Sequence, residues 1–157
     1  MIFVSLGTQK QSMKRLLEYL EHLKLKETII VQNGNTTFTS ASMQLVGFLT
    51  YDEMEAYIKA ADVVICHGGG GTIFQALHQQ KKVICVPRLK KYHEHINDHQ
   101  VEMIDTLVKK GYLLECRTEE ELKDALQGIK NYHPTPYAPN RIRFVKEMQQ
   151  QIDQLLQ

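Results

Sequence analysis

Charge of one sign is not in excess in this sequence: 19 Lys and Arg residues are balanced by 18 Asp and Glu residues, which leaves a formal net charge of +1. A general nucleic-acid binder is normally more basic, so we expect no nucleic acid among the partners. Cysteines are also few: Cys66, Cys85 and Cys116 are odd in number and widely spaced, with no C-x-x-C pair that would hold zinc. This pattern is typical of a reduced, cytosolic protein.

Long hydrophobic runs are absent as well. No apolar stretch approaches the roughly 20 residues that a membrane-spanning helix needs. The first residues, MIFV, lack the basic region of a secretory signal. We therefore expect any membrane role to come through a surface or a partner. With 157 residues, of which 43% are hydrophobic and 24% charged, the chain has the composition of one soluble globular domain.

What the sequence does contain is a regular alternation of short apolar runs with segments of helical period. This alternation is typical of an α/β fold, a Rossmann-like parallel sheet with helices on both faces. The expected strands cover residues 2–6, 28–32, 44–48, 62–66, 82–86 and 112–115. Apolar residues three and four positions apart predict helices over residues 13–23 and 96–108. Two capping boxes, which mark helix starts, are formed by Thr50 with Glu53 and by Thr118 with Glu121.

Prolines divide the chain near its end. Pro134, Pro136 and Pro139 separate the body of the chain from a last segment of helical period. We therefore expect one domain over residues 1–133 and, over residues 134–157, a Pro-rich connection and an amphipathic helix that contacts a partner. The apolar stripe of that helix would comprise Val145, Met148, Ile152, Leu155 and Leu156. The alternative is a helix folded back on its own sheet, to which Ile142 and Phe144 would add apolar surface.

The most informative segment leads from a buried strand through a glycine loop into a helical pattern. The loop consists of His67, Gly68, Gly69, Gly70, Gly71 and Thr72. Glycines let backbone N–H groups approach an anion, and the helix dipole adds about half a positive charge. We expect a phosphate site, with a protonatable His67 and the Thr72 hydroxyl as further donors that add to the positive field; a turn that serves only packing is the alternative. The sequence lacks G-x-x-x-x-G-K-[ST] and, after its first strand, G-x-G-x-x-G, which argues against an ATPase and a dinucleotide oxidoreductase.

A second polar segment, residues 87–100, follows the next expected strand. In an open parallel sheet, ligands bind at the carboxyl ends of the strands, so this segment and the glycine loop should border the same crevice. Its Asn, His and Gln side chains are suited to sugar hydroxyls, and Arg88 to a phosphate. A metal site and a solvated polar loop are the alternatives, but the Asn and Gln neighbours favour a sugar, so we expect no metal. The metal ligands would be His93, His95, His99 and Glu94.

The combination of a strand, H-G-G-G-G-T, a helix, a strand, Pro87 and N-D-H-Q resembles the donor-binding C-terminal domain of glycosyltransferase family 28, whose inverting enzymes have the GT-B fold. Residues 2–9, IFVSLGTQ, are similar to the first strand and loop of that group. Residues 94–100, EHINDHQ, look like the bacterial version of its sugar-binding loop. The chain is most similar to single-domain subunits, those of the dolichol-linked N-acetylglucosaminyltransferase and of bacterial exopolysaccharide glycosyltransferases. The similarity extends through Cys116.

The resemblance implies a binding site for a UDP-sugar donor, with no cofactor. The glycine loop would bind the diphosphate, and His99 and Gln100 the donor sugar. Gln75 stands where related enzymes place a Glu that holds both ribose hydroxyls, so ribose binding is expected to be weaker or differently arranged here. Phe48 and Leu49 match the position that packs on uracil, unless they are simple core residues. The implied donor-binding residues outside the glycine loop are Gly7, Thr8, Phe48, Leu49, Gln75, Arg88, His95, Asn97, His99 and Gln100.

The resemblance further implies that the chain is half of a GT-B fold. In two-domain relatives the catalytic base and the acceptor groove belong mainly to the N-terminal domain, which a chain of 157 residues lacks. Glu94 is the only candidate for the base, and a solvent-facing charge is its alternative role. We therefore expect the catalytic, donor-binding subunit of a split hexosyltransferase.

A membrane-anchored, acceptor-binding subunit would recruit this chain to the cytoplasmic face of a membrane. The acceptor would be a lipid-linked saccharide in exopolysaccharide or glycan assembly. The alternatives are a non-catalytic nucleotide-sugar-binding or enhancer subunit and a free-standing nucleotide-sugar hydrolase or epimerase.

Overall fold

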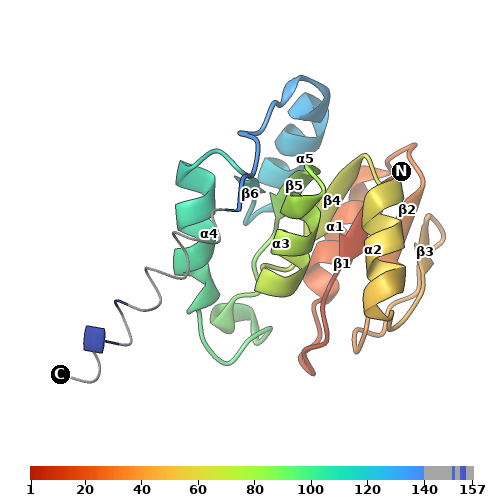
Figure 1. The fold of residues 1–157 in the computed structure, drawn as a ribbon. Helices are drawn as coiled ribbons and strands as arrows, with labels where there is room; N and C mark the ends of the chain where they lie inside the picture. Colours follow the sequence, from red (N-terminus) through yellow and green to blue (C-terminus); the bar gives the residue numbers. More distant parts are fainter. Residues whose placement is uncertain (140–149, 151–152, 155–157) are drawn as a thin grey trace.

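The computed structural model describes residues 1–139 together with Gln150, Asp153 and Gln154. Its centre is a six-stranded parallel sheet with the strand order β3-β2-β1-β4-β5-β6 (Figure 1). The strands are β1 (Ile2–Ser5), β2 (Ile29–Gln32), β3 (Met43–Leu45), β4 (Val63–Cys66), β5 (Lys82–Cys85) and β6 (Leu114–Glu115). Each lies within or overlaps a range that the sequence predicts. The strand β3 ends earlier than expected, because Gly47 turns the chain with a φ of +74°.

Helices cover both faces of the sheet, as the sequence predicts. They are α1 (Lys14–Leu23), α2 (Tyr51–Ala60), α3 (Gly70–His78), α4 (Gln100–Lys109) and α5 (Glu119–Gly128), with short 3₁₀ turns at Lys90–Tyr92 and Ile129–Asn131. In Figure 1, α2, α3 and α4 lie in front of the sheet, and α1 and α5 lie behind it. Both predicted capping boxes are present, at the starts of α2 and α5. The Rossmann-like, doubly covered architecture is therefore confirmed.

Two separate hydrophobic clusters hold these layers together. Successive side chains of a strand point to opposite faces, so Ile2 and Val4 of β1 join the cluster beneath α1 and α5, whereas Phe3 joins the cluster beneath α2, α3 and α4. All four residues of β1 are buried, as expected of a strand in the middle of a sheet that is covered on both sides. The core thus fixes β1 and β4 side by side, in parallel register from Ile2 opposite Val63 to Ser5 opposite Cys66.

The helix predicted to begin at Ile96 begins instead at Gln100. Two turns replace its first part: the Asn97 side chain accepts a hydrogen bond from the His99 N–H at 3.1 Å, and the Asp98 side chain accepts one from the Lys90 N–H at 2.9 Å. Asn and Asp compete with helical hydrogen bonds in this way. As a result Ile96 lies outside the helix, and its side chain is 72% exposed. His95 therefore does not share a helix turn with His99.

The Pro-rich segment is attached to the body of the molecule at Tyr137. The Gln80 side-chain amide donates to the Tyr137 carbonyl at 2.8 Å and accepts from the Tyr137 N–H at 3.1 Å. The Tyr137 ring also meets the rings of His78 and Tyr112 edge to face. The apolar stripe predicted for the C-terminal helix, together with Ile142 and Phe144, lies outside the described residues. Within the described part of the chain, no helix has the length and hydropathy to cross a membrane.

Candidate functional site

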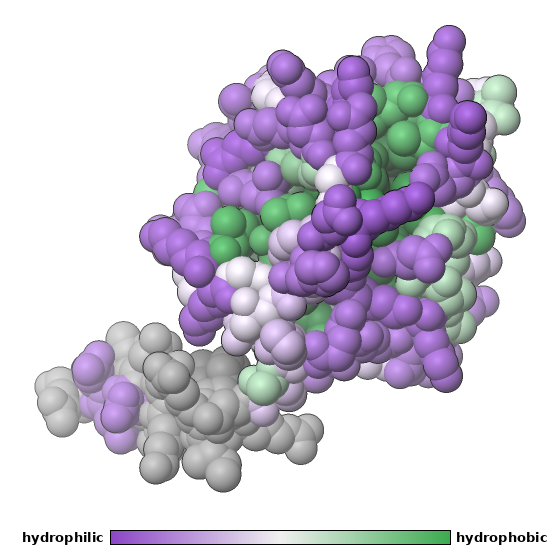
Figure 2. Space-filling view, turned by 90° about the horizontal axis from the view of Figure 1, so that it is seen from above, coloured by the Kyte–Doolittle hydropathy of each residue, from purple (hydrophilic) through white to green (hydrophobic). Residues whose placement is uncertain are grey.

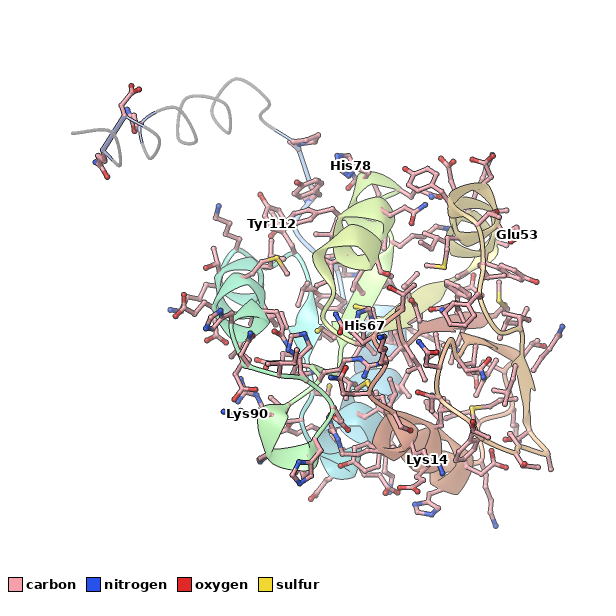
Figure 3. All side chains as sticks on the ribbon, turned by 90° about the horizontal axis from the view of Figure 1, so that it is seen from below. Lys14, Glu53, His67, His78, Lys90 and Tyr112 are labelled. Carbon is pink, nitrogen blue, oxygen red and sulfur yellow. The ribbon has the colours of Figure 1, made fainter. Side chains whose placement is uncertain are left out.

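A pocket of about 240 Å³ opens at the carboxyl ends of the central strands. The strand order reverses between β1 and β4, and the crevice at such a reversal is where doubly wound sheets bind ligands. Figure 3 looks onto this end of the sheet, with His67 near the middle of the face. The pocket is lined by Ser5, Gly7, Thr8, Gln9, Gln32, Leu49, Met54, His67, Gly69, Gly71 and Thr72. Seven of these belong to the set that the sequence analysis names: Gly7, Thr8, Leu49, His67, Gly69, Gly71 and Thr72.

Two glycines hold the His67 ring between them. A Cβ atom at Gly7 would lie 2.5 Å from His67 Cε1 and Nε2, and one at Gly69 would lie closer still to Nε2. Gly7 also has a φ of +74°, which a residue with a side chain rarely adopts. A substitution at Gly69 would therefore move the imidazole, in addition to any effect on a bound anion. The open position in the loop is Gly71, whose added Cβ would meet no atom within 4 Å.

The imidazole of His67 is neutral in the free protein. Burial, and then the nearby positive charge of Arg88, lower the pKa of His67 to about 4. Its Nδ1 lies 3.2 Å from the Ser5 carbonyl oxygen. Because a carbonyl oxygen only accepts, Nδ1 carries the proton and Nε2 is left as an acceptor. His67 is therefore uncharged in the free protein near pH 7, so the expectation that it adds to the positive field is wrong there.

The positive field in the pocket comes from the start of α3. The first backbone N–H groups of a helix have no acceptor within the helix, and the dipole makes this end positive. The first turn of α3 carries no acidic side chain that would cancel this field. The Thr72 hydroxyl, which is buried, lies 3.4 Å from the Ser5 hydroxyl at the pocket floor. This end of α3 can bind an anion of the size of a phosphate group without a metal ion.

Sequence reasoning missed Gln32, the last residue of β2. Its side chain is 3% exposed and pairs twice with Gly7: Nε2 donates to the Gly7 carbonyl at 3.0 Å, and Oε1 accepts from the Gly7 N–H at 3.0 Å. Oε1 also accepts from the Ser5 hydroxyl at 2.9 Å. The sequence feature that could have indicated this role is the position of Gln32, an amide at the carboxyl end of an otherwise apolar strand. Ser5, Gln9 and Met54, which also line the pocket, were missed as well.

Other predicted residues do not line the pocket. They are Phe48, Gly68, Gly70, Gln75, Arg88, His95, Asn97, His99 and Gln100. Phe48 is 58% exposed, and the Gln75 amide donates to the Tyr51 carbonyl at 3.4 Å. The side-chain amide of Gln100, the first residue of α4, donates to the Arg88 carbonyl at 3.1 Å. Among the described residues, no three His, Cys, Asp or Glu side chains are grouped to hold a metal ion.

The expectation that Arg88 meets a phosphate is not supported by the structure. Its side chain is 1% exposed, and its guanidinium donates to three backbone carbonyls, those of Leu6 at 2.7 Å, Gln11 at 2.6 Å and Glu94 at 3.0 Å. Arg88 thus ties the loop after β1 to the loop after β5. A guanidinium held in this way in the interior is a structural group, because both of its terminal nitrogens already donate to backbone carbonyls, and only Nε has no hydrogen-bond partner among the described residues.

Glu94 is not placed to act as a base. Arg15 binds both of its oxygens, from Nε to Oε1 at 2.9 Å and from Nη2 to Oε2 at 2.8 Å, and the Leu89 N–H donates to Oε2 at 3.1 Å. The Glu94 side chain is 3% exposed, so the solvent-facing alternative is also wrong. The pocket wall formed by the described residues contains no carboxylate.

A larger cavity, of about 750 Å³, lies at the opposite end of the sheet. Leu23, Leu25, Leu126 and Ile129 give it apolar walls, and Lys82 is among the lysines at its edge. Figure 2 looks onto this end and shows hydrophobic surface among hydrophilic side chains. This cavity borders the amino ends of the strands, away from every predicted site residue. The smaller pocket is therefore the better candidate site, because it combines polar groups with a helix N-terminus.

Comparison with known proteins shows the family to which the chain belongs. The model of the glycosyltransferase family 28 C-terminal domain matches residues 1–155. The UDP-N-acetylglucosamine transferase subunit ALG13 of Debaryomyces hansenii is 29% identical over 142 residues, 80% of this chain and 65% of that protein. The UDP-N-acetylglucosamine–N-acetylmuramyl-(pentapeptide) pyrophosphoryl-undecaprenol N-acetylglucosamine transferase of Streptococcus sanguinis is 32% identical over 104 residues, 61% of this chain and 28% of that protein.

The fold is also that of a solved structure. An NMR solution structure of ALG13 has 17% sequence identity and a TM-score of 0.59, and the match covers 94% of this chain and 93% of that one. The chain spans less than two thirds of the length of the curated relatives that it matches.

Proposed function

Because the chain belongs to the family of the glycosyltransferase family 28 C-terminal domain, we propose that it binds a UDP-sugar in the pocket at the carboxyl ends of β1, β2 and β4. The observation that carries this proposal is the start of α3, which presents free N–H groups to a pocket where Gly7 and Gly69 leave no space for side chains. The names of the relatives, which specify UDP-N-acetylglucosamine transferases, identify the first donor to test.

In the proposed complex each part of the donor has its own binding residues. The diphosphate lies against the glycine loop, with Thr72 as a hydroxyl donor and Gly7 and Thr8 on the other side. Uracil packs on Leu49, which lines the pocket, and on its neighbour Phe48, whose side chain is exposed, and Gln75 binds the ribose. The sugar extends toward the loop before α4. The residues proposed to bind it are His95, Asn97, His99 and Gln100.

We propose that the reaction is an inverting hexosyl transfer in which this chain supplies the donor half. The helix N-terminus stabilises the diphosphate as it leaves, which is the charge that develops in the transition state. The acceptor hydroxyl also needs a base. Because the pocket wall of the described residues offers no carboxylate, we propose that the base comes from a second subunit.

The partner proposed for this chain is a membrane-anchored, acceptor-binding subunit. The relatives support it by their names: one is called a transferase subunit, and another acts on an undecaprenol-linked acceptor. We propose a lipid-linked saccharide acceptor, in exopolysaccharide or glycan assembly, and a place for this chain at the cytoplasmic face of the membrane. Residues 1–133 would form the donor-binding domain and residues 134–157 the contact with the partner.

Substitution of Gln100 tests the placement of the sugar. Gln100→Ala is expected to weaken the binding of UDP-N-acetylglucosamine by about tenfold or more, because a sugar hydroxyl loses its hydrogen bond, and to leave UDP binding unchanged. Calorimetry with both ligands measures the difference. Gln79→Ala, which removes an amide that contacts only the Glu55 carbonyl, is the control. Equal losses for UDP and the UDP-sugar would place Gln100 on the nucleotide instead.

An activity assay separates the proposed transferase from its alternatives. The isolated chain is expected to bind UDP-N-acetylglucosamine without releasing UDP. Steady release of UDP by the chain alone would identify a hydrolase. Conversion of the sugar without release of UDP would identify an epimerase. With an acceptor-binding subunit supplied, transfer is expected; donor binding that remains unproductive in that complex would identify a non-catalytic binding subunit.

A further inference from the structure

The side chain of Gln32 continues the hydrogen-bond pattern of the sheet beyond the end of β2. Within the strands, β1 and β2 pair as far as Ser5 opposite Gln32. Beyond that point the Gln32 amide takes the place of a backbone peptide: it donates to the Gly7 carbonyl and accepts from the Gly7 N–H, both at 3.0 Å. The orientation of the Gly7 peptide is therefore set by a side chain from the neighbouring strand.

The same amide sets the direction of the hydrogen bonds beneath the pocket. Gln32 Oε1 can only accept, so the Ser5 hydroxyl, at 2.9 Å, must donate its single proton to it. In the 3.4 Å contact between Ser5 and Thr72, Ser5 can then only accept, so the single proton of Thr72 goes to Ser5 in the free protein and is the one that Thr72 would turn toward a bound diphosphate. Gln32 thus connects the Gly7 turn with the first turn of α3, the two segments that border the pocket from opposite sides.

We propose that Gln32 is a positioning residue for the donor diphosphate, acting through Gly7 and through the Ser5–Thr72 pair. This inference rests on the proposed function, because it requires that the diphosphate binds between these two segments. Gly7 needs external support, since it has a φ of +74° and its backbone lies against the His67 ring. A buried amide with its partners satisfied holds such a turn in one conformation, and a fixed conformation lowers the entropy cost of binding.

Gln32→Glu tests the proposal through its dependence on pH. A neutral carboxylic acid has one donor and one acceptor, so it can reproduce both bonds to Gly7, whereas a carboxylate cannot donate to the Gly7 carbonyl. Burial and the facing Gly7 carbonyl oxygen raise the pKa of the introduced carboxyl group, so a larger fraction of it is protonated at pH 5.5 than at pH 8. The charged and titratable groups near this turn are Arg88, which donates to the Leu6 carbonyl, and His67, whose pKa of about 4 keeps it neutral over that range.

The chain offers a control with the same hydrogen-bond pattern outside the pocket lining. Gln80, whose side chain is exposed, pairs with Tyr137 by donating to its carbonyl at 2.8 Å and accepting from its N–H at 3.1 Å. Gln80→Glu is therefore the same substitution in the same pattern of bonds, away from the buried turn at Gly7. A second variant, Gln32→Asn, keeps an uncharged amide on a side chain that is one methylene shorter, so the amide cannot reach Gly7. We expect this variant to bind the UDP-sugar weakly at every pH.

Calorimetry with UDP-N-acetylglucosamine, whose diphosphate does not titrate in this range, measures affinity relative to the unsubstituted chain at pH 8 and pH 5.5. We expect Gln32→Glu to bind about tenfold more weakly at pH 8 and within about twofold at pH 5.5. We expect Gln80→Glu to match the unsubstituted chain at both. Four results would overturn this inference while leaving the proposed function intact. Gln32→Glu could bind with full affinity at pH 8 or lose affinity equally at both pH values. Gln32→Asn could bind with full affinity, or Gln80→Glu could lose as much affinity as Gln32→Glu. Failure of the unsubstituted chain to bind would overturn the proposed function and this inference with it.

Discussion

Gly71→Asp is expected to weaken UDP binding about a hundredfold while the fold is retained. The added Cβ would meet no atom within 4 Å, so the side chain fits without displacing a neighbour. A carboxylate in the first turn of α3 also interacts favourably with the helix dipole, so the free energy of unfolding should not fall. Against a diphosphate about 6 Å away, at an effective dielectric constant of about 20, its charge costs about 3 kcal/mol, which is roughly a hundredfold in affinity.

The control for this prediction is Gly71→Asn, which has nearly the same shape without the charge. We expect its UDP affinity to stay within about threefold of the unsubstituted chain, a difference of under about 0.7 kcal/mol. Calorimetry gives both affinities, and urea unfolding confirms that both variants are folded. If Gly71→Asp binds UDP as tightly as Gly71→Asn, the diphosphate does not bind at the start of α3.

Glu94→Ala is expected to destabilise the protein by about 3 kcal/mol or more, because it leaves the charge of Arg15 in a largely buried place. The side chains of Arg15 and Glu94 are only 12% and 3% exposed, and the pair joins α1 to the loop after β5. The Arg15 guanidinium also lies 4.5 Å from the centre of the Tyr92 ring, so the loss extends to the packing of that loop. Urea unfolding measures the change.

Another Arg–Glu pair in the chain provides the comparison. Arg117 and Glu115 are 2.8 Å apart, but the Arg117 side chain is 44% exposed. Glu115→Ala should therefore cost no more than about 1 kcal/mol. A loss of stability for Glu94→Ala as small as that for Glu115→Ala would contradict the structural role of Glu94.

The transfer activity of Glu94→Gln tests the catalytic role separately. Retained activity would show that Glu94 is not the base, since loss of a general base typically lowers the rate about a hundredfold or more.

Features that depend on local sequence were predictable. The capping boxes at Thr50 and Thr118 involve residues three apart, and both helices begin there. The apolar runs predict the strands. The glycine loop is predicted correctly at the end of β4, because consecutive residues determine the turn from strand to helix. The start of α4 was not predicted correctly, because the Asn97 and Asp98 side chains interrupt the helix before Gln100.

Features that depend on distant contacts could not be predicted. Arg88 and Glu94 looked like polar residues of a binding loop, but their partners lie 77 and 79 residues away, at Gln11 and Arg15. The neutral state of His67 follows from burial, which residue type alone does not reveal. The role of Gln32 depends on Gly7, which lies 25 residues earlier, in the loop after the neighbouring strand β1. The sequence therefore indicated the chemistry of the site better than the groups that hold it in place.

The central claim is that a UDP-sugar binds at the carboxyl ends of the strands. A titration of the ¹⁵N-labelled chain with UDP-N-acetylglucosamine, with EDTA present and followed by the NMR signals of the backbone amides, tests it most directly. We expect saturable shifts at Gly7, Thr8 and residues 67–72, and unshifted signals at Leu23 and Leu25 beside the larger cavity. The absence of saturable shifts, or shifts centred on that larger cavity, would contradict it.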